Sequence, residues 1–238
     1  MRLKLTLEYV GTSFRGWAAQ PGLRTVEAEL RRALGQTFAA SERLAVGGRT
    51  DAGVHALGQV VSVEVEGGPP VERAADALNT ALPEDIRVIR SELAPTGFHA
   101  RRSALERTYR YRIWRRGTAS PFELGRSWWM PGPLDEDRLS ESASQLVGKH
   151  DFRAFTPTQT QHENFARSVS EAAWERRGHA LEFSISAGSF LRHMVRTLVG
   201  SMIEGTPRQL AELLEGAPRA EAGLTAPPWG LYLERIEY

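Results

Sequence analysis

The chain has 238 residues, of which 25% are charged and 41% hydrophobic, and its formal net charge is only +1. A chain of this length forms one large domain or two small ones, and it buries enough surface to fold without disulfides or structural metals. It contains no cysteine and no apolar run near the roughly 18 residues of a membrane span, which excludes thiolate nucleophiles, cysteine-ligated metal centres and a transmembrane helix. The alternating start, Met1–Tyr9, is not typical of a signal peptide, so we expect a cytoplasmic protein.

The first half of the chain reads as strand, helix, strand, strand, helix, strand. Leu3, Leu5 and Leu7 alternate with polar residues, which predicts a half-buried strand. Thr25 predicts the N-cap of a helix whose apolar side chains recur at every fourth position. The remaining elements predicted here are strands near Leu44–Val46 and Val61–Glu66, a helix over Val71–Leu82 ended by Pro83, and a strand around Ile86–Ser91.

The second half repeats this order without repeating the sequence. The predicted elements are a strand Thr108–Arg115, a helix Asp135–Val147 ended by Gly148, strands Ser168–Arg176 and Ala180–Ala187, an apolar-striped helix Phe190–Ile203, a helix Pro207–Glu215 and a strand Leu231–Tyr238. Between them, the polar segment Thr156–Asn164 predicts an exposed loop. The order indicates an α+β fold of two ferredoxin-like (split βαβ) units with largely antiparallel sheets, divided into residues 1–100 and 101–238.

The basic residues are unevenly distributed. Of the 30 lysines and arginines, 28 are arginine, and the segment Phe98–Arg116 holds seven arginines against the single Glu106. This segment therefore carries a net charge of +6 and the rest of the chain −5. Genome composition can explain the excess of arginine, but it does not explain the clustering. The planar arginine fork suits phosphate and base contacts, so the cluster favours an RNA-binding surface with the arginines on one face of the strand Thr108–Arg115.

The segment Gly47–Ala56, which joins two predicted strands, is richer in reactive residue types than a hairpin requires. One interpretation is a plain loop in which Asp and Gly supply turn geometry. A turn does not require Arg49 and Asp51 two residues apart, however, nor three glycines that permit a close approach of a ligand. A carboxylate held beside an arginine stays ionised and can act as a nucleophile, which makes Asp51 a candidate catalytic residue.

Other motifs do not support a competing chemistry. The glycines of Gly11–Gly16 have the spacing of a phosphate-binding loop, but Trp17 follows where lysine is required. The six histidines form no His-x-x-x-His pair, and no Gly-x-Ser-x-Gly elbow or dinucleotide fingerprint occurs. Arg192 and Arg196 lie four apart on a predicted helix, as on any solvated helix face. Tyr109 and Tyr111 fit either core packing or base stacking.

A series of ordered motifs resembles the tRNA pseudouridine synthase A family nearly from end to end. These motifs are Tyr9–Trp17 with Gln20-Pro21, Gly48–Ala56, Leu78–Ile86, Phe98–Arg101 with Arg107–Arg112, His150–Phe152, Phe190–Gly200 and Gly230–Leu233. The resemblance implies a pseudouridine-synthase-type fold and isomerisation of uridine to pseudouridine at positions 38, 39 and 40 of the tRNA anticodon arm. It implies no cofactor and no metal, and a homodimer with tRNA lying across both subunits.

By the same resemblance, Asp51 is the nucleophile, and whether it attacks the uracil ring or the ribose stays open. Tyr109 matches a tyrosine that stacks on the target base, and Arg196 matches an arginine that pairs with the catalytic aspartate. Arg49 matches the motif arginine that holds the flipped nucleotide. The further candidate RNA-binding residues are Arg101, Arg110 and His55.

Two other functions remain as alternatives. A non-catalytic RNA-binding protein is consistent with the basic strand Thr108–Arg115, but it leaves Arg49 and Asp51 unexplained. A hydrolase acting on glycosidic bonds would need a second acid beside Asp51, and no second carboxylate stands in a comparable motif. The sequence therefore favours an RNA isomerase that needs neither membrane nor small-molecule cofactor.

Overall fold

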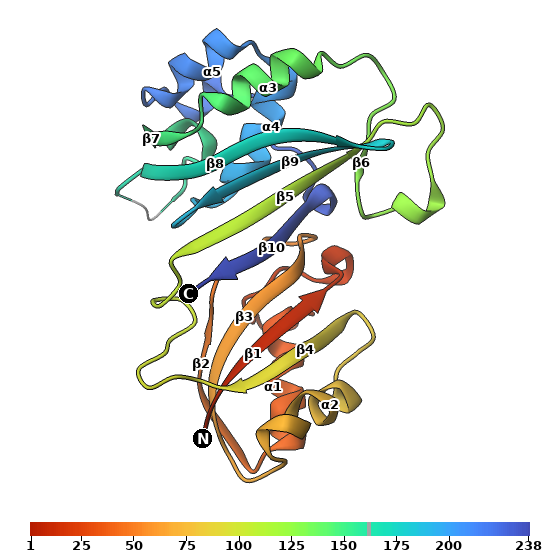
Figure 1. Cartoon of the computed structure of the whole chain (residues 1–238), viewed down its shortest axis with the longest axis vertical. Helices are drawn as coiled ribbons and strands as arrows, with labels where there is room; N and C mark the ends of the chain where they lie inside the picture. The colour runs from red at the N-terminus through yellow and green to blue at the C-terminus, as the bar shows by residue number, and fades with distance from the viewer. Residues whose placement is uncertain (161–162) are drawn as a thin grey trace. The chain divides into compact units, whose positions relative to one another are not determined.

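The computed structural model describes residues 1–160 and 163–238 (Figure 1). The chain divides into two compact units, Met1–Leu105 with Leu233–Tyr238 and Glu106–Tyr232, where the sequence predicted 1–100 and 101–238. The predicted loop Thr156–Asn164 includes residues 161–162, which lie outside the described residues. Each unit is an α+β arrangement with a mostly antiparallel sheet, as predicted.

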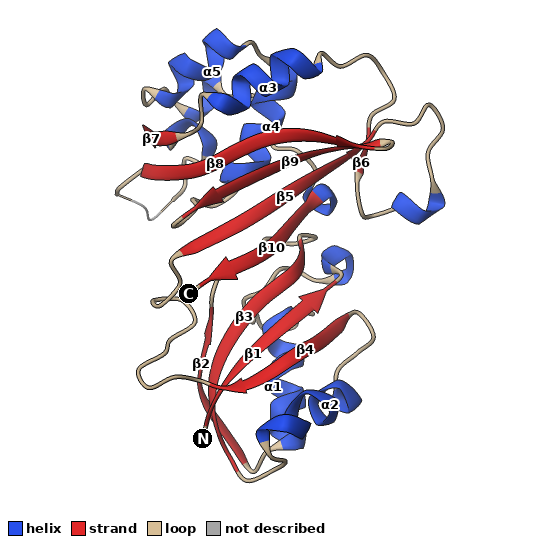
Figure 2. Ribbon diagram, viewed as in Figure 1, coloured by secondary structure: helices blue, strands red, loops and turns tan. Residues whose placement is uncertain are grey.

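The first unit contains the six elements predicted for it, in the predicted order. They are β1 (Arg2–Tyr9), α1 (Val26–Thr37), β2 (Ala40–Val46), β3 (His55–Glu66), α2 (Val71–Ala81) and β4 (Ile86–Leu93). The strands lie in the order β4-β1-β3, with β2 also paired to β3, and every pair of neighbours is antiparallel. Helices α1 and α2 lie together on one side of these strands (Figure 2).

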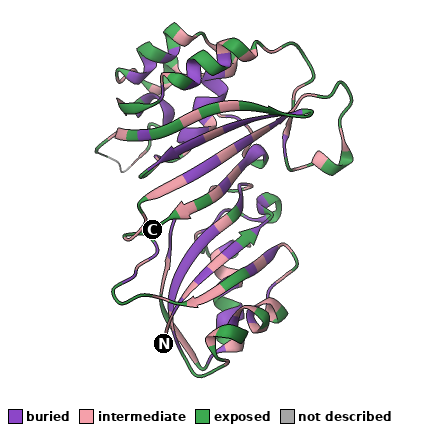
Figure 3. Cartoon of the chain, in the orientation of Figure 1, coloured by how far each residue is buried: buried purple, intermediate pink, exposed green. Residues whose placement is uncertain are grey.

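Burial follows the sequence pattern that predicted these elements. Leu3, Leu5 and Leu7 of β1 are fully buried, whereas the residues between them are half-buried. The neighbouring strand β3 is mostly buried (Figure 3). The hydroxyl of Thr25 accepts a hydrogen bond from the amide of Ala28 at 3.3 Å and caps α1. The buried face of α1 begins at Val26, directly after the Thr25 cap, so the cap and the apolar stripe both favour a helix start at this point.

Strand β3 begins six residues before the predicted strand, at His55 instead of Val61. Gly58 and the polar Gln59 interrupt the valine alternation, which hides this first half of the strand from a reading of the sequence. Gly58 lies where another chain segment approaches, because a Cβ there would stand 2.5 Å from the carbonyl oxygen of Glu234. Glycine is required by close backbone packing at this point.

That approaching segment is β10 (Leu231–Glu237), which lies beside β3. Its end is anchored in the first unit by a hydrogen bond from the Tyr238 hydroxyl to the Ala100 carbonyl at 2.9 Å. The Tyr238 and Phe98 rings pack at 4.9 Å between centroids. These contacts explain why the last six residues belong with the first unit; the sequence shows that a strand is present but not which strand it joins.

The second unit contains more elements than the sequence predicted. They are β5 (Glu106–Trp114), β6 (Trp128–Trp129), α3 (Glu136–Ser144), β7 (Gly148–Asp151), β8 (Ala166–Arg177), β9 (Ala180–Ala187), α4 (Met194–Glu204) and α5 (Pro207–Leu214). The strands lie in the order β5-β9-β8-β7, with β6 paired to β5. Apolar side chains meet in register across β5 and β9, where Tyr111 faces Phe183 and Ile113 faces Leu181. The three helices pack on one face of this sheet (Figure 1).

Two predicted helix boundaries differ from the structure by more than one residue. Helix α3 ends at Ser144, not at Val147, and Gly148 opens the short strand β7 instead of closing the helix. Helix α4 begins at Met194, not at Phe190, because His193 adopts a left-handed conformation with φ of 62°. Arg192 therefore lies before the helix and does not share a helix face with Arg196, contrary to the prediction.

The Thr206–Gln209 pair forms a complete capping box at the start of α5, in which each residue's side chain bonds to the other's backbone.

The sequence predicts no membrane-spanning helix. None of the helices in residues 1–160 and 163–238 has both the length and the apolar composition to cross a membrane.

Candidate active site

The loop between β2 and β3 carries two of the candidate residues, and its backbone forms a tight turn. Arg49 is exposed and Asp51 is half-buried, whereas Thr50 between them is buried. The amide of Val54 donates to the Asp51 carbonyl at 3.2 Å, and Gly53 has a φ of 81°. Asp51 therefore lies in a compact turn whose curvature requires glycine.

The segment Gly11–Trp17 packs directly against this loop. The amide of Trp17 donates to the Thr50 carbonyl at 3.0 Å, and the amide of Gly53 donates to the Phe14 carbonyl at 3.2 Å. Gly16 has a φ of 89°, and a Cβ there would stand 2.9 Å from the Thr50 carbonyl oxygen. Two motifs that lie more than thirty residues apart in the sequence thus form one backbone assembly around Asp51.

The same segment is fixed from its other side by an ion pair. Arg24 donates two hydrogen bonds to the Asp85 carboxylate, each at 2.8 Å, and its guanidinium lies 4.0 Å from the centre of the Phe14 ring. The hydrogen bond to Asp85 raises the pKa of Arg24. A bidentate pair of this kind has one strongly preferred geometry, so it fixes the position of Phe14 and the chain around it.

A buried polar network lies beneath the loop. The hydroxyl groups of Tyr9 and Thr50 are 2.7 Å apart, and the Gln59 side-chain amide donates to the Tyr9 hydroxyl at 3.3 Å. The same amide donates to the Gly48 carbonyl at 2.6 Å, while the Gly48 amide donates to Gln59 Oε1 at 3.3 Å. Burial raises the pKa of Tyr9 to about 12, which keeps its hydroxyl protonated.

His55, a candidate RNA-binding residue, lies at the start of β3 with its side chain only 2% exposed. Its Nδ1 accepts a hydrogen bond from the amide of Gly11 at 3.0 Å. This ring therefore supports the backbone of Gly11–Trp17, and a contact with RNA at His55 stays a prediction. Gly11 itself is tightly packed, because a Cβ there would collide with the Val54 carbonyl at 1.9 Å.

In the second unit, Tyr109 lies on β5 opposite Ile185, and its side chain is 8% exposed. Its ring meets the ring of Phe190 edge to face, with centroids 5.0 Å apart. Phe190 lies before α4, in the segment that the sequence had placed inside that helix. The edge contact fixes the orientation of the tyrosine ring, a requirement for a side chain that stacks on a base.

Arg196 lies in the first turn of α4 and is half-buried. Its Nε donates to the Ala226 carbonyl at 2.7 Å, and its own carbonyl accepts from the Ala226 amide at 3.1 Å. The side chain is thus oriented by the segment that leads to β10. Its charge also acts on Tyr111, whose pKa is raised by burial and lowered in part by the Arg196 guanidinium.

Arg110 and Arg112 of β5 are held in ion pairs, which changes the interpretation of the basic cluster. Arg110 and Arg112 both bind Glu182, whose side chain is 4% exposed, and Arg112 also binds Glu123 at 2.8 Å. The Arg112 guanidinium holds the pKa of Glu123 below its usual range. The two carboxylates compensate much of the charge that the sequence assigned to an RNA-binding face. Arg110 is half-buried and Arg101 is exposed. A contact with RNA at either residue stays a prediction.

The structure therefore gathers Arg49, Asp51 and His55 in the first unit, and it places Tyr109 and Arg196 in the second. The sequence did not predict the network that supports the loop. Tyr9 and Thr50 stand inside recognisable motifs, and the signal for Gln59 is one polar residue in a run of valines, but neither pattern indicates that the three side chains meet.

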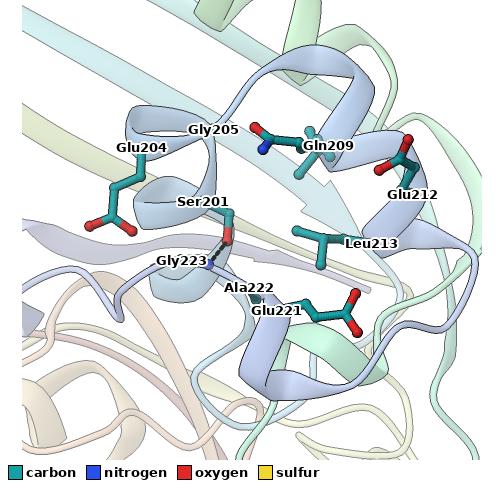
Figure 4. A pocket seen from close by; sticks show the side chains of 10 residues that line it. Ser201, Glu204, Gly205, Gln209, Glu212, Leu213, Glu221, Ala222 and Gly223 are labelled. Carbon is teal, nitrogen blue, oxygen red and sulfur yellow. Dashed lines mark hydrogen bonds between the residues drawn. The ribbon is translucent and has the colours of Figure 1, made fainter.

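Other parts of the molecule offer little competing chemistry. Within the described ranges, no three or more His, Asp or Glu side chains are placed to hold a metal ion. A pocket of about 460 Å³ lies between α4, α5 and the segment 219–223 (Figure 4). Its polar groups include Ser201, which accepts from the Gly223 amide, and Glu204, which accepts from the Leu224 amide. None of the candidate residues lines it.

Comparison with known proteins identifies the family to which this arrangement belongs. A family model described as tRNA pseudouridine synthase matches residues 142–238. The tRNA pseudouridine synthase A of Rhodopseudomonas palustris (strain HaA2) is 41% identical over 243 residues, covering 100% of this chain and 99% of that protein. The same enzyme of Methylococcus capsulatus is 40% identical, covering 100% and 90%. That of Bacillus subtilis is 37% identical, covering 100% and 99%.

A likeness to solved structures is weaker. A chain of the "Crystal Structure of a Cbf5-Nop10-Gar1 Complex" aligns with 97% of this chain and 57% of its own length, at 13% identity and a TM-score of 0.39. The full-length relatives confirm the resemblance found in the ordered motifs. The chain belongs to the tRNA pseudouridine synthase A family, and it is an isomerase that forms pseudouridine in tRNA.

Proposed function

We propose that this enzyme converts uridine to pseudouridine at positions 38, 39 and 40 of the tRNA anticodon arm, with Asp51 as its nucleophile. The observation that carries this proposal is the placement of Asp51. It lies in a loop whose backbone is held by Gly11–Trp17 and by Gln59, while Tyr9 bonds to the side chain of the adjacent Thr50. A nucleophile is effective when it is held in one geometry, and the hydrogen bonds to this loop restrict the position of Asp51.

The reaction breaks the bond between uracil N1 and the ribose C1′ and forms a bond between C5 and C1′. The C5 proton passes to water and N1 gains a proton, so nothing is oxidised or reduced and no cofactor is needed. The Asp51 carboxylate supplies the nucleophile, at the ring or at the ribose, and we propose that the Arg196 guanidinium pairs with it during the reaction.

The target uridine lies in a paired and stacked arm, so it must leave the stack at a cost of a few kcal/mol. We propose that Tyr109 stacks on the extruded base and that Arg49 holds the flipped nucleotide. The edge contact between Phe190 and Tyr109 favours a fixed ring, and the exposure of Arg49 leaves its guanidinium accessible to a phosphate. Aromatic stacking of this kind contributes roughly 1–3 kcal/mol per base.

The remaining parts of the proposal concern the assembly. We propose a pseudouridine-synthase-type fold of two split βαβ units, with the catalytic loop in the first domain and the rest of the cleft supplied by the second. The antiparallel strand order β4-β1-β3-β2 supports this for the first unit. From family membership we also propose a cytoplasmic homodimer that binds tRNA across both subunits, with Arg101, Arg110 and His55 on the RNA side.

Release of tritium from tRNA labelled at C5 of uridine tests the reaction. The wild-type protein should release tritium from a tRNA with uridine at positions 38, 39 and 40, and cytidine at all three positions should abolish the release. Release that persists without these uridines would contradict the proposed positions. A non-catalytic RNA-binding protein would bind the tRNA and release no tritium, and a glycosidic hydrolase would yield free uracil.

A further inference from the structure

The network beneath the catalytic loop is closed and buried. Tyr9 and Thr50 are 4% and 7% exposed, and Gln59 is fully buried. Buried polar groups are retained only when hydrogen-bonded, and here each of the three side chains has at least one partner. An apolar residue at each position would fill the same space, so the network points to a role beyond filling the core.

The Tyr9 hydroxyl links the other two side chains of the network. It accepts a hydrogen bond from the Gln59 side-chain amide and shares a second one with Thr50 Oγ1 at 2.7 Å, for which either hydroxyl can be the donor. The raised pKa of Tyr9 keeps its hydroxyl protonated throughout the neutral range. At the other end, Gln59 binds both the carbonyl and the amide of Gly48. The Gln59 side chain therefore satisfies both backbone groups of Gly48, as a paired strand does in a sheet.

Gly48 and Thr50 flank Arg49, and Asp51 follows Thr50 directly. The network holds the loop at its strand side, and the amide of Trp17 holds the Thr50 carbonyl on the opposite side. We propose that Tyr9, Gln59 and Thr50 are positioning residues that set the geometry of Asp51 for attack. This inference rests on the proposed function of Asp51, since a loop without a nucleophile would not need it.

The expected effect is on the chemical step. A nucleophile displaced by about 1 Å can lose on the order of 100-fold in rate, so loss of one bond in the network should slow the reaction about 10- to 100-fold. Binding of tRNA should change by less than about 3-fold, because none of the three buried side chains is accessible to RNA. A defect in rate with unchanged binding separates positioning from substrate recognition.

Single-turnover tritium release with excess full-length enzyme provides the measurement. Tyr9→Phe and Thr50→Val each remove one hydroxyl at nearly constant volume, and Thr50→Ser restores the hydroxyl and should recover the rate to within about 3-fold. Ser91→Ala is the matched control, because it removes a hydroxyl bond to the Val71 carbonyl elsewhere in the same unit. A partly unfolded preparation lowers the amplitude of the reaction, whereas a misplaced Asp51 lowers its rate constant.

The double variant Tyr9→Phe with Thr50→Val adds a test of coupling. Both changes remove the same hydrogen bond, so the double variant should be no slower than the slower single variant. Wild-type rate constants in Tyr9→Phe and Thr50→Val would overturn the positioning role, as would failure of Thr50→Ser to recover the rate. Asp51→Asn is measured alongside: if it retains turnover, the proposed nucleophile is wrong, and if it is inactive while Tyr9→Phe is fully active, the positioning inference alone fails.

Discussion

Replacement of Gly16 by alanine should damage the loop that carries Asp51, although Gly16 precedes Asp51 by 35 positions in the sequence. Gly16 has a φ of 89°, which an L side chain adopts only under strain. Its added Cβ would stand 2.9 Å from the Thr50 carbonyl oxygen and 3.2 Å from the Ala52 amide nitrogen. All the nearest atoms are backbone, so they cannot swing aside as the end of a flexible side chain would.

The magnitude has two parts. An alanine in the left-handed region costs about 1–2 kcal/mol. Insertion of a methyl group into closely packed backbone adds about 1–3 kcal/mol through local displacement. Gly16→Ala should therefore lower the free energy of unfolding by about 2–5 kcal/mol. Because the displaced atoms belong to Thr50 and Ala52, it should also slow single-turnover pseudouridine formation about 10-fold or more.

Gly22→Ala is the matched control. Gly22 has a φ of 71° in the turn that follows Gln20 and Pro21, and a Cβ there meets nothing within 4 Å. This variant carries the backbone strain without the collision, so it should lose only about 1–2 kcal/mol and keep the wild-type rate. Urea unfolding and single-turnover tritium release measure the two effects. Equal losses in both variants would refute the claim that Gly16 is required by its contact with the loop.

Three further predictions concern an ion pair, a helix cap and two of the basic residues. Arg112 lowers the pKa of Glu123 in the folded state, so Glu123 stabilises the fold above its unfolded pKa of about 4.3 and loses this effect as pH falls through the lower folded pKa. The difference in free energy of unfolding between wild type and Glu123→Gln, measured with urea, should be full at pH 7 and shrink below about pH 4.3. A difference that does not change with pH would contradict this. Thr206→Ala removes the capping box of α5 and should cost about 1 kcal/mol, as checked by thermal unfolding. Arg101→Ala should weaken tRNA binding, measured by a salt titration, and reduce the slope of log affinity against log salt by about 1. Arg110→Met should weaken tRNA binding in the same titration and also destabilise the fold by breaking its bond to Glu182; unchanged salt slopes in both variants would contradict this.

The elements that the sequence predicted well are those with a strong local pattern. The strand Ala180–Ala187 has the predicted bounds, because Leu181, Phe183 and Ile185 alternate without interruption. Helix α1 begins where Thr25 indicated, since cap and apolar stripe coincide. Period and capping are properties of adjacent residues, so a single sequence contains them.

The elements that the sequence did not predict depend on partners far along the chain. Strand β7 has the residues Gly-Lys-His-Asp and owes its conformation to pairing with β8. The start of α4 depends on the left-handed conformation of His193, which no local pattern indicates. In the same way, the early start of β3 becomes intelligible only when Glu234 of β10 is seen against Gly58.

The candidate site shows the same division. The motif around Asp51 could be read from the sequence together with its family resemblance. The compensation of Arg110 and Arg112 by Glu182 could not, because Glu182 lies about 70 residues away on a neighbouring strand. A count of charges along the chain therefore overstated the positive charge available to RNA. The support of the loop by Gln59 was hidden for the same reason.

The central claim is that the Asp51 carboxylate is the nucleophile, and Asp51→Asn tests it most directly because the substitution removes the charge and keeps the shape. Its single-turnover tritium release is measured beside its affinity for the same tRNA. We predict no detectable release with tRNA affinity within about 3-fold of wild type, since the loop is held by backbone contacts that the substitution does not touch. Tritium release by Asp51→Asn at a rate near that of the wild type would contradict the account.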